Sequence, residues 1–124
     1  MERMKVVVFW AGAFALLTSA AFAGAAVPAS AAPQRGRAAQ VERGRAVYSE
    51  RCTRCHGADG AGRTRMADLV EPPDMTDRAW QRGRGDARMI ASVANGRGGM
   101  PAFKRKLSRA DIAAAVAYVR TLAR

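Results

Sequence analysis

The stretch Cys52-Thr53-Arg54-Cys55-His56 decides how this chain folds and what it binds. The pattern C-x-x-C-H is the one at which haem is attached to protein through two thioether bonds. Two cysteines at this spacing can reach the two vinyl groups on one edge of the porphyrin, and the histidine that follows can place an imidazole nitrogen on the iron. The stretch therefore predicts one covalently bound haem c, held by Cys52, Cys55 and His56.

Two other chemistries also use closely spaced cysteines. A redox-active C-x-x-C lies beside a βαβ unit, and no such alternation of strand and helix patterns is evident in this sequence. A structural zinc ion takes about four protein ligands, whereas the whole chain has two cysteines and one histidine. Haem is therefore favoured over thiol redox chemistry and over zinc.

The residue counts limit which side chains could be the sixth ligand of the iron. His56 is the only histidine, which excludes ligation by two histidines and leaves a methionine, a weaker donor or an open position. The methionines that follow the N-terminal segment are Met66, Met75, Met89 and Met100. Around Met100, Gly98 and Gly99 permit a close approach of the backbone to the porphyrin face, and Pro101 stiffens the exit. Met100 is favoured, the alternative being a methionine that only fills space in a tight turn.

Apolar residues at helical spacing predict three helices, and no strand pattern competes with them. The first covers about residues 40–50, and the second covers about residues 86–94 and ends at Asn95-Gly96, a pair suited to a C-cap. The third follows Ser108, an N-cap whose partner in a variant of the capping box is Asp111. The buried stripe of this last helix comprises Ile112, Ala115, Val116, Val119 and Leu122. The sequence therefore predicts an all-α fold.

From about Gln40 to Arg124 the chain resembles a class I c-type cytochrome. The resemblance is carried by the haem motif near the start, the segment Gly96-Arg97-Gly98-Gly99-Met100-Pro101-Ala102-Phe103, and a closing amphipathic helix, in this order. It implies a cytochrome c-like fold, with about three to four helices around one covalently bound haem. It also implies that the sulfur of Met100 is the second axial ligand, together with His56.

The same resemblance suggests roles for residues outside the motif. Gly44 lacks a side chain, so another helix can cross the first one closely there, and Tyr118 occupies the position of the aromatic residue that meets this glycine in the family. The carbonyl of Pro72 or Pro73 is a candidate acceptor for the Nδ1 hydrogen of His56. By their own chemistry, and not through the resemblance, candidate partners of the haem propionates are Trp80, Arg63, Arg65, Arg82 and Arg84. The alternatives are a core position for Trp80 and solvated charge for the arginines.

The N-terminal part has the features of an export signal. Arg3 and Lys5 precede an apolar stretch, and Ala21-Phe22-Ala23 provides small residues for cleavage, which defines residues 1–23 as a signal peptide. No charge occurs between Val6 and Pro33, so a retained membrane anchor stays open as the alternative.

In either case we expect the haem domain to face the periplasm of a bacterium. Residues 24–39 are rich in Ala, Pro and Arg and have few large apolar side chains, so they predict a flexible tether. Residues 40–124 then form the haem domain.

The chain is strongly basic, with a formal net charge of +11. Removal of residues 1–23 takes away Glu2, Arg3 and Lys5, a net charge of +1, and leaves +10. Export and covalent haem argue against nucleic acid as the partner of this charge. The remaining partners for this charge are redox proteins with an acidic docking surface, or an anionic membrane surface. The best candidate for such a patch is Lys104-Arg105-Lys106, which follows the predicted methionine loop.

These observations together predict an electron transfer protein of the bacterial envelope. With His56 and Met100 on the iron, no small-molecule substrate should bind there, and the chain is not expected to be an enzyme. A permanent haem c subunit of a larger periplasmic dehydrogenase or oxidase complex is the first alternative. A haem sensor or ligand-binding protein with an open iron position is the second.

Overall fold

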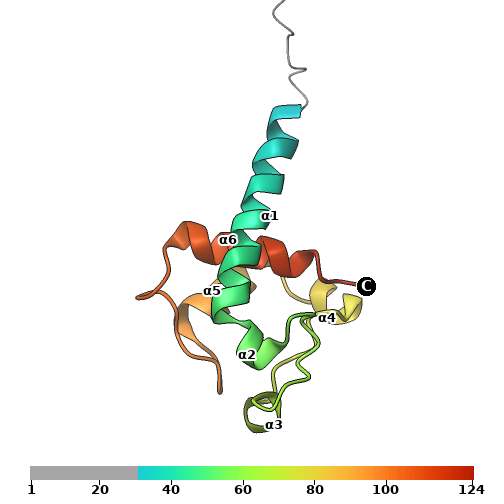
Figure 1. Ribbon diagram of the computed structural model, residues 1–124, viewed down its shortest axis with the longest axis vertical. Helices are drawn as coiled ribbons and strands as arrows, with labels where there is room; N and C mark the ends of the chain where they lie inside the picture. Colours follow the sequence, from blue (N-terminus) through green and yellow to red (C-terminus); the bar gives the residue numbers. More distant parts are fainter. Residues whose placement is uncertain (1–30) are drawn as a thin grey trace, which may run out of the picture.

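A computed structural model describes residues 31–124, and the regular elements in this range are helices (Figure 1). They are α1 (Ala31–Arg51), α2 (Thr53–His56), α3 (Ala67–Val70), α4 (Arg78–Arg82), α5 (Asp86–Asn95) and α6 (Arg109–Arg120). Within the described range there is no strand, only an isolated β-bridge between Arg97 and Met100. The predicted all-α fold is thus confirmed, with three additional short helices. The predicted signal peptide or anchor at residues 1–23, and residues 24–30 of the predicted tether, lie outside the described residues.

None of the helices between residues 31 and 124 combines the length and the apolar character needed to span a bilayer.

Helix α1 is longer at its N-terminal end than the sequence predicted. It begins at Ala31 rather than at about Gln40, so residues 31–39 of the predicted tether are helical. Alanine and arginine, which make up most of these residues, have high helix propensity, and Pro33 lies in the first turn, where proline is tolerated. Residues 33–39 are exposed, and Figure 1 shows this end of α1 extending away from the other helices.

Helices α1 and α6 cross at Gly44, as the sequence predicted. A Cβ atom at Gly44 would overlap the carbonyl group of Ala114 and lie 3.0 Å from the nitrogen of Ala115. A side chain at this position would therefore force the two helices apart. The atoms nearest to Gly44 belong to the α6 backbone rather than to Tyr118. Tyr118 packs on Tyr48, one turn along α1 from Gly44, with ring centroids 5.2 Å apart at an interplanar angle of 54°.

The predicted capping box of α6 is present and also ties this helix to α1. The Ser108 side chain accepts a hydrogen bond of 3.0 Å from the Asp111 nitrogen, and the Asp111 carboxylate accepts one of 3.3 Å from the Ser108 nitrogen. Arg43 of α1 reaches the same carboxylate at 2.7 Å. The hydrogen bond from the Ser108 hydroxyl and the Arg43 guanidinium lower the pKa of Asp111.

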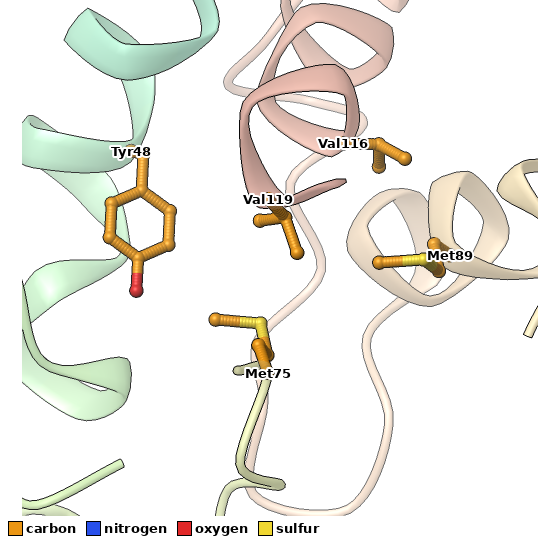
Figure 2. Packing of buried hydrophobic residues seen from close by; sticks show 5 residues of the cluster. All are labelled: Tyr48, Met75, Met89, Val116 and Val119. Carbon is orange, nitrogen blue, oxygen red and sulfur yellow. The ribbon is translucent and has the colours of Figure 1, made fainter. Parts of the chain in front are cut away.

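The hydrophobic core lies where α1, α5 and α6 meet the loop that precedes α4. Its buried cluster comprises Tyr48, Met75, Met89, Val116 and Val119, and Figure 2 shows these side chains converging from four segments of the chain. In the predicted stripe of α6, Ile112 and Ala115 are also buried, and Leu122 packs against the cluster while partly buried. The five residues of this cluster also form part of the wall of a cavity.

A polar network that the sequence did not predict joins α4 and the start of α5 to α6. The amide nitrogen of Gln81, a residue only 5% exposed, donates hydrogen bonds to the carbonyls of Met75 at 2.8 Å and Val119 at 2.9 Å. Arg120 donates to the Gln81 carbonyl at 2.7 Å, to the Gln81 side-chain oxygen at 2.8 Å and to the Arg84 carbonyl. The network fixes the residues of α4 and of the turn that follows it.

Candidate haem site

A cavity of about 760 Å³ lies between the haem motif, the loop before α4, helices α4 to α6 and the Met100 loop. Its volume falls within the roughly 300–1,000 Å³ that is usual for cofactor sites. All four residues predicted from the sequence line this one cavity: Cys52, Cys55, His56 and Met100. The fold thus brings together residues that are far apart in the sequence.

The haem motif is held in place by the end of α1 and by the turn after α2. The Cys52 nitrogen donates to the Tyr48 carbonyl at 2.9 Å, and the His56 nitrogen donates to the Cys52 carbonyl at 2.9 Å. The buried Tyr48 hydroxyl donates to the carbonyl of Gly57 at 2.7 Å. Burial raises the pKa of Tyr48, so its hydroxyl stays protonated and remains a donor. Gly57 has φ 76°, which allows the chain to turn directly after His56.

The His56 side chain is buried in the cavity wall, with 9% of its surface exposed. Burial lowers its pKa, which favours the neutral imidazole that a metal requires. Its Nδ1 atom is buried and has no hydrogen-bond partner among residues 31–124. Pro72 and Pro73 both line the cavity, but neither carbonyl accepts this hydrogen in the structure, so the choice between them stays open.

The two cysteines are free, half-buried thiols in the cavity wall. Burial, and next the neighbouring Cys55, raise the pKa of Cys52 to about 11. Redox-active cysteines are those whose pKa is lowered, so this environment does not favour thiol redox chemistry at Cys52. In the described part of the chain, no three His, Cys, Asp or Glu side chains are grouped as ligands of a metal ion.

The loop that carries Met100 is a tight turn anchored on α5. Arg97 and Met100 exchange two backbone hydrogen bonds of 3.0 Å, and Gly98 between them has φ 56°. The Phe103 nitrogen donates to the carbonyl of Val93 at 3.0 Å, which fixes the exit of the loop. We call residues 97–101 the distal loop. It holds the half-buried Met100 at the cavity wall.

The other three methionines also line the cavity, so lining alone does not single out Met100. Met75 and Met89 are buried members of the hydrophobic core. The sulfur of Met66 faces the guanidinium of Arg54, with the sulfur and Nη2 3.9 Å apart. Met100 therefore stays the predicted ligand, because it alone lies in a loop with the glycines and proline described above.

Trp80 and Arg84 form a polar corner of the cavity. The indole nitrogen of Trp80 is buried and has no hydrogen-bond partner among the described residues. The Arg84 guanidinium carbon lies 4.6 Å from the centroid of the Trp80 ring. Of the four arginines predicted as propionate partners, Arg84 lines the cavity, whereas Arg63 pairs with Asp59 at 3.8 Å.

The unpartnered nitrogens test whether the cavity suits a haem. Buried polar groups are nearly always hydrogen-bonded, so the unpartnered nitrogens of His56 and Trp80 mark positions that need a further group. Haem brings carboxylates that can accept from the Trp80 nitrogen. Iron would take the other ring nitrogen of His56, Nε2, so the Nδ1 hydrogen needs a carbonyl such as that of Pro72 or Pro73, both of which line the cavity. The apolar remainder of the wall suits the porphyrin body. The residues present therefore fit haem c.

The basic residues at the cavity differ from those that the sequence suggested. Lys104-Arg105-Lys106 is exposed and follows Phe103, which lines the cavity, but does not itself line it, so its role as a docking patch stays a prediction. The arginines that do line the cavity are Arg51, Arg54, Arg84 and Arg97. The sequence contained a signal for two of them, since Arg54 lies inside the haem motif and Arg51 directly precedes it.

Comparison with known proteins places this site in a family. Residues 39–119 match the family described as cytochrome C oxidase, cbb3-type, subunit III. The chain is similar to the cbb3-type cytochrome c oxidase subunit CcoP of Azospirillum brasilense, with 35% identity over 86 residues, 68% of this chain and 29% of that protein. It is also similar to the subunit FixP of Bradyrhizobium diazoefficiens, with 35% identity over 81 residues, 64% of this chain and 27% of that protein. The match thus spans less than a third of the length of these relatives.

Solved structures show the same fold. The c-type cytochrome KustC0563 superimposes with a TM-score of 0.62 and 30% identity, over 65% of this chain and 98% of that one. A chain of a Kuenenia stuttgartiensis reducing HAO-like protein complex has a TM-score of 0.62 at 23% identity, covering 69% of this chain and 44% of that one, which shows the fold alone. The chain belongs to the family of cytochrome c oxidase, cbb3-type, subunit III, and its domain is a small mono-haem cytochrome c that binds haem c covalently and transfers electrons.

Proposed function

We propose that this chain works as a permanent haem c subunit of a larger oxidase complex rather than as a freely diffusing carrier. The observation that carries the proposal is the match of residues 39–119 to an oxidase subunit family. The similar proteins CcoP and FixP are themselves described as subunits of cbb3-type oxidases. The first alternative interpretation of the sequence is therefore favoured over the free carrier.

The proposal gives each site residue one role. Cys52 and Cys55 would form the thioether bonds, and His56 and Met100 would hold the iron. Bound haem supplies a one-electron couple between Fe(III) and Fe(II). With haem bound, the buried ring of His56 and the sulfur of Met100 would both hold the iron, so no small molecule would be a substrate there. On this account the chain moves electrons and catalyses no reaction by itself.

The same proposal assigns the protein to the periplasmic side of a bacterial membrane. Residues 1–23 either leave after export or stay as an anchor, and residues 24–39 connect them to the haem domain. A retained anchor suits a permanent subunit, because it confines the haem domain to the membrane that holds its partner and so raises the effective concentration of one for the other.

Purification of the full chain from its own membranes tests this proposal. A C-terminally tagged chain, solubilised in mild detergent, should copurify in fixed ratio with an oxidase. The association should survive a high-salt wash, because salt does not weaken contacts made by a hydrophobic anchor or a large interface. Salt does screen the attraction between basic residues and anionic lipid. Release of the chain by osmotic shock as a free monomer would favour the diffusing carrier, and release by salt alone would favour the lipid surface.

The basic charge is proposed to steer redox partner proteins with an acidic docking surface. Arg51 and Arg97 lie at the cavity wall and are exposed, so they are placed where a partner would approach the haem. The rate of electron transfer should fall as salt shortens the Debye length from about 30 Å at ~0.01 M to about 10 Å at ~0.1 M. Stopped-flow measurement with an acidic redox protein as the probe gives this rate.

Charge reversal tests whether Arg51 and Arg97 form a docking patch. Arg51→Glu with Arg97→Glu should slow association and flatten the salt dependence. The matched control is Arg45→Glu with Arg109→Glu, since both residues are exposed, neither lines the cavity, and the change in net charge is equal. An equal loss of rate in both pairs would show that bulk charge, not a docking patch, is responsible.

A further inference from the structure

The segment around α3 connects the haem motif to the distal loop, although the sequence analysis assigned no role to the helix itself. We define the α3 segment as residues 64–71. Within it, Met66 and Val70 line the cavity, while Leu69 points outward with 76% of its surface exposed. A helix of this length with an exposed leucine has little apolar burial to hold it in place. Its position must therefore come from contacts at its two ends.

At its N-terminal end, the α3 segment is attached to the haem motif. The Thr64 hydroxyl donates to the carbonyl of Cys55 at 3.1 Å and accepts from the Ala67 nitrogen at 3.1 Å. The Arg54 guanidinium lies 3.9 Å from the sulfur of Met66. These contacts join α3 to the residues that carry the thioethers.

At its C-terminal end, the α3 segment presses against the distal loop. A Cβ atom at Gly99 would lie 2.7 Å from the Cβ and 2.8 Å from the Cγ1 of Val70, closer than packed carbon atoms approach. Gly99 is not among the residues with positive φ. The glycine is therefore required by the close approach of Val70 and not by the conformation of its own backbone.

The residue after α3 is held in an uncommon conformation. Glu71 has φ 44° and ψ 59°, and it is the single non-glycine residue with positive φ in the described part of the chain. Left-handed backbone is unfavourable at a residue with a side chain and persists where the surroundings impose it. This turn ends α3 beside Gly99 and leads to Pro72, which also lines the cavity. A strained turn at this position indicates that the surrounding contacts hold the end of α3 in place.

We propose that the α3 segment is a brace that positions the distal loop and thereby the sulfur of Met100. Val70 is the positioning residue, because its side chain is in contact with Gly99, which directly precedes Met100. The brace begins on Cys55 and ends on the distal loop, so it links the two ligand-bearing segments on the rim of one cavity. This inference rests on the proposed role of Met100 as the sixth ligand.

Three variants of the full chain test the brace. Gly99→Ala adds a methyl group against Val70 and should weaken the Met-to-iron charge-transfer absorption of the oxidised protein. It should also let imidazole bind Fe(III) about tenfold faster, which corresponds to an activation free energy lower by about 1.4 kcal/mol. In Gly99→Ala with Val70→Gly, the nearest atom of residue 70 is Cα at 3.3 Å, and both readouts should return toward the wild type. Val70→Ala removes atoms that pack against Gly99 and adds none. It should therefore raise the rate of imidazole binding but keep the charge-transfer absorption.

The control is Gly85→Ala, because Gly85 has ordinary φ and no atom lies within 4 Å of its Cβ position. It should leave both readouts unchanged. The brace is wrong if Gly99→Ala behaves like Gly85→Ala, or if the double variant is as impaired as Gly99→Ala alone. If Gly99→Ala does not fold, an unchanged imidazole rate in Val70→Ala contradicts it. A wild-type protein that lacks the charge-transfer absorption would instead contradict the ligand role of Met100.

Discussion

Met100→Ala is expected to abolish the Met-to-iron charge-transfer absorption completely and to let carbon monoxide bind the reduced protein without displacing a ligand. The reason is that alanine offers no donor atom, and the chain has no second histidine that could replace the sulfur. Absorption spectra of the oxidised and the CO-treated reduced protein measure both effects. The wild type should exclude carbon monoxide, which also separates an electron carrier from a haem sensor.

Met66→Ala is the matched control for this experiment. Met66 lines the same cavity, but its sulfur faces Arg54, so its removal should leave the absorption intact. Met75→Ala and Met89→Ala should also keep the absorption, but each is expected to cost about 2–5 kcal/mol of stability because these side chains are core. If Met100→Ala retained the absorption and excluded carbon monoxide, another residue would be the ligand.

Replacing both cysteines is expected to have an equally large effect. The double variant Cys52→Ala with Cys55→Ala should hold haem only through coordination and packing, so the haem should leave with an organic solvent. Each single variant should keep its haem through the remaining thioether. Its absorption should shift to longer wavelength, since an unreacted vinyl group stays conjugated with the macrocycle. Solvent extraction followed by absorption spectra of both phases measures this. Retention of haem by the double variant would contradict attachment at these residues.

The parts of the fold that depend on local chemistry could be predicted from the sequence. Ser108 and Asp111 form the predicted capping box because this motif depends only on residues three positions apart. The close crossing at Gly44 was predictable because a glycine on an apolar helix face has few other uses. One local motif likewise identified Cys52, Cys55 and His56 as site residues, and all three line the cavity.

The parts that depend on distant contacts could not be predicted. The hydrogen bonds of Gln81 and Arg120 join residues far apart in the sequence and have no local signature. The ring contact between Tyr118 and Tyr48 likewise joins residues of two helices and has no local signature. The brace was hidden because Val70 and Gly99 form no motif and meet only in the folded chain.

Covalent attachment of haem at Cys52 and Cys55 can be checked by extracting the purified wild-type protein with acidified acetone. Acid breaks the coordination by His56 and Met100, so haem held only by its iron would move into the acetone. The thioether bonds survive this treatment. The colour is expected to stay with the precipitated protein, and no free thiol should be detected. Haem in the acetone phase, together with two free thiols on the protein, would contradict covalent attachment.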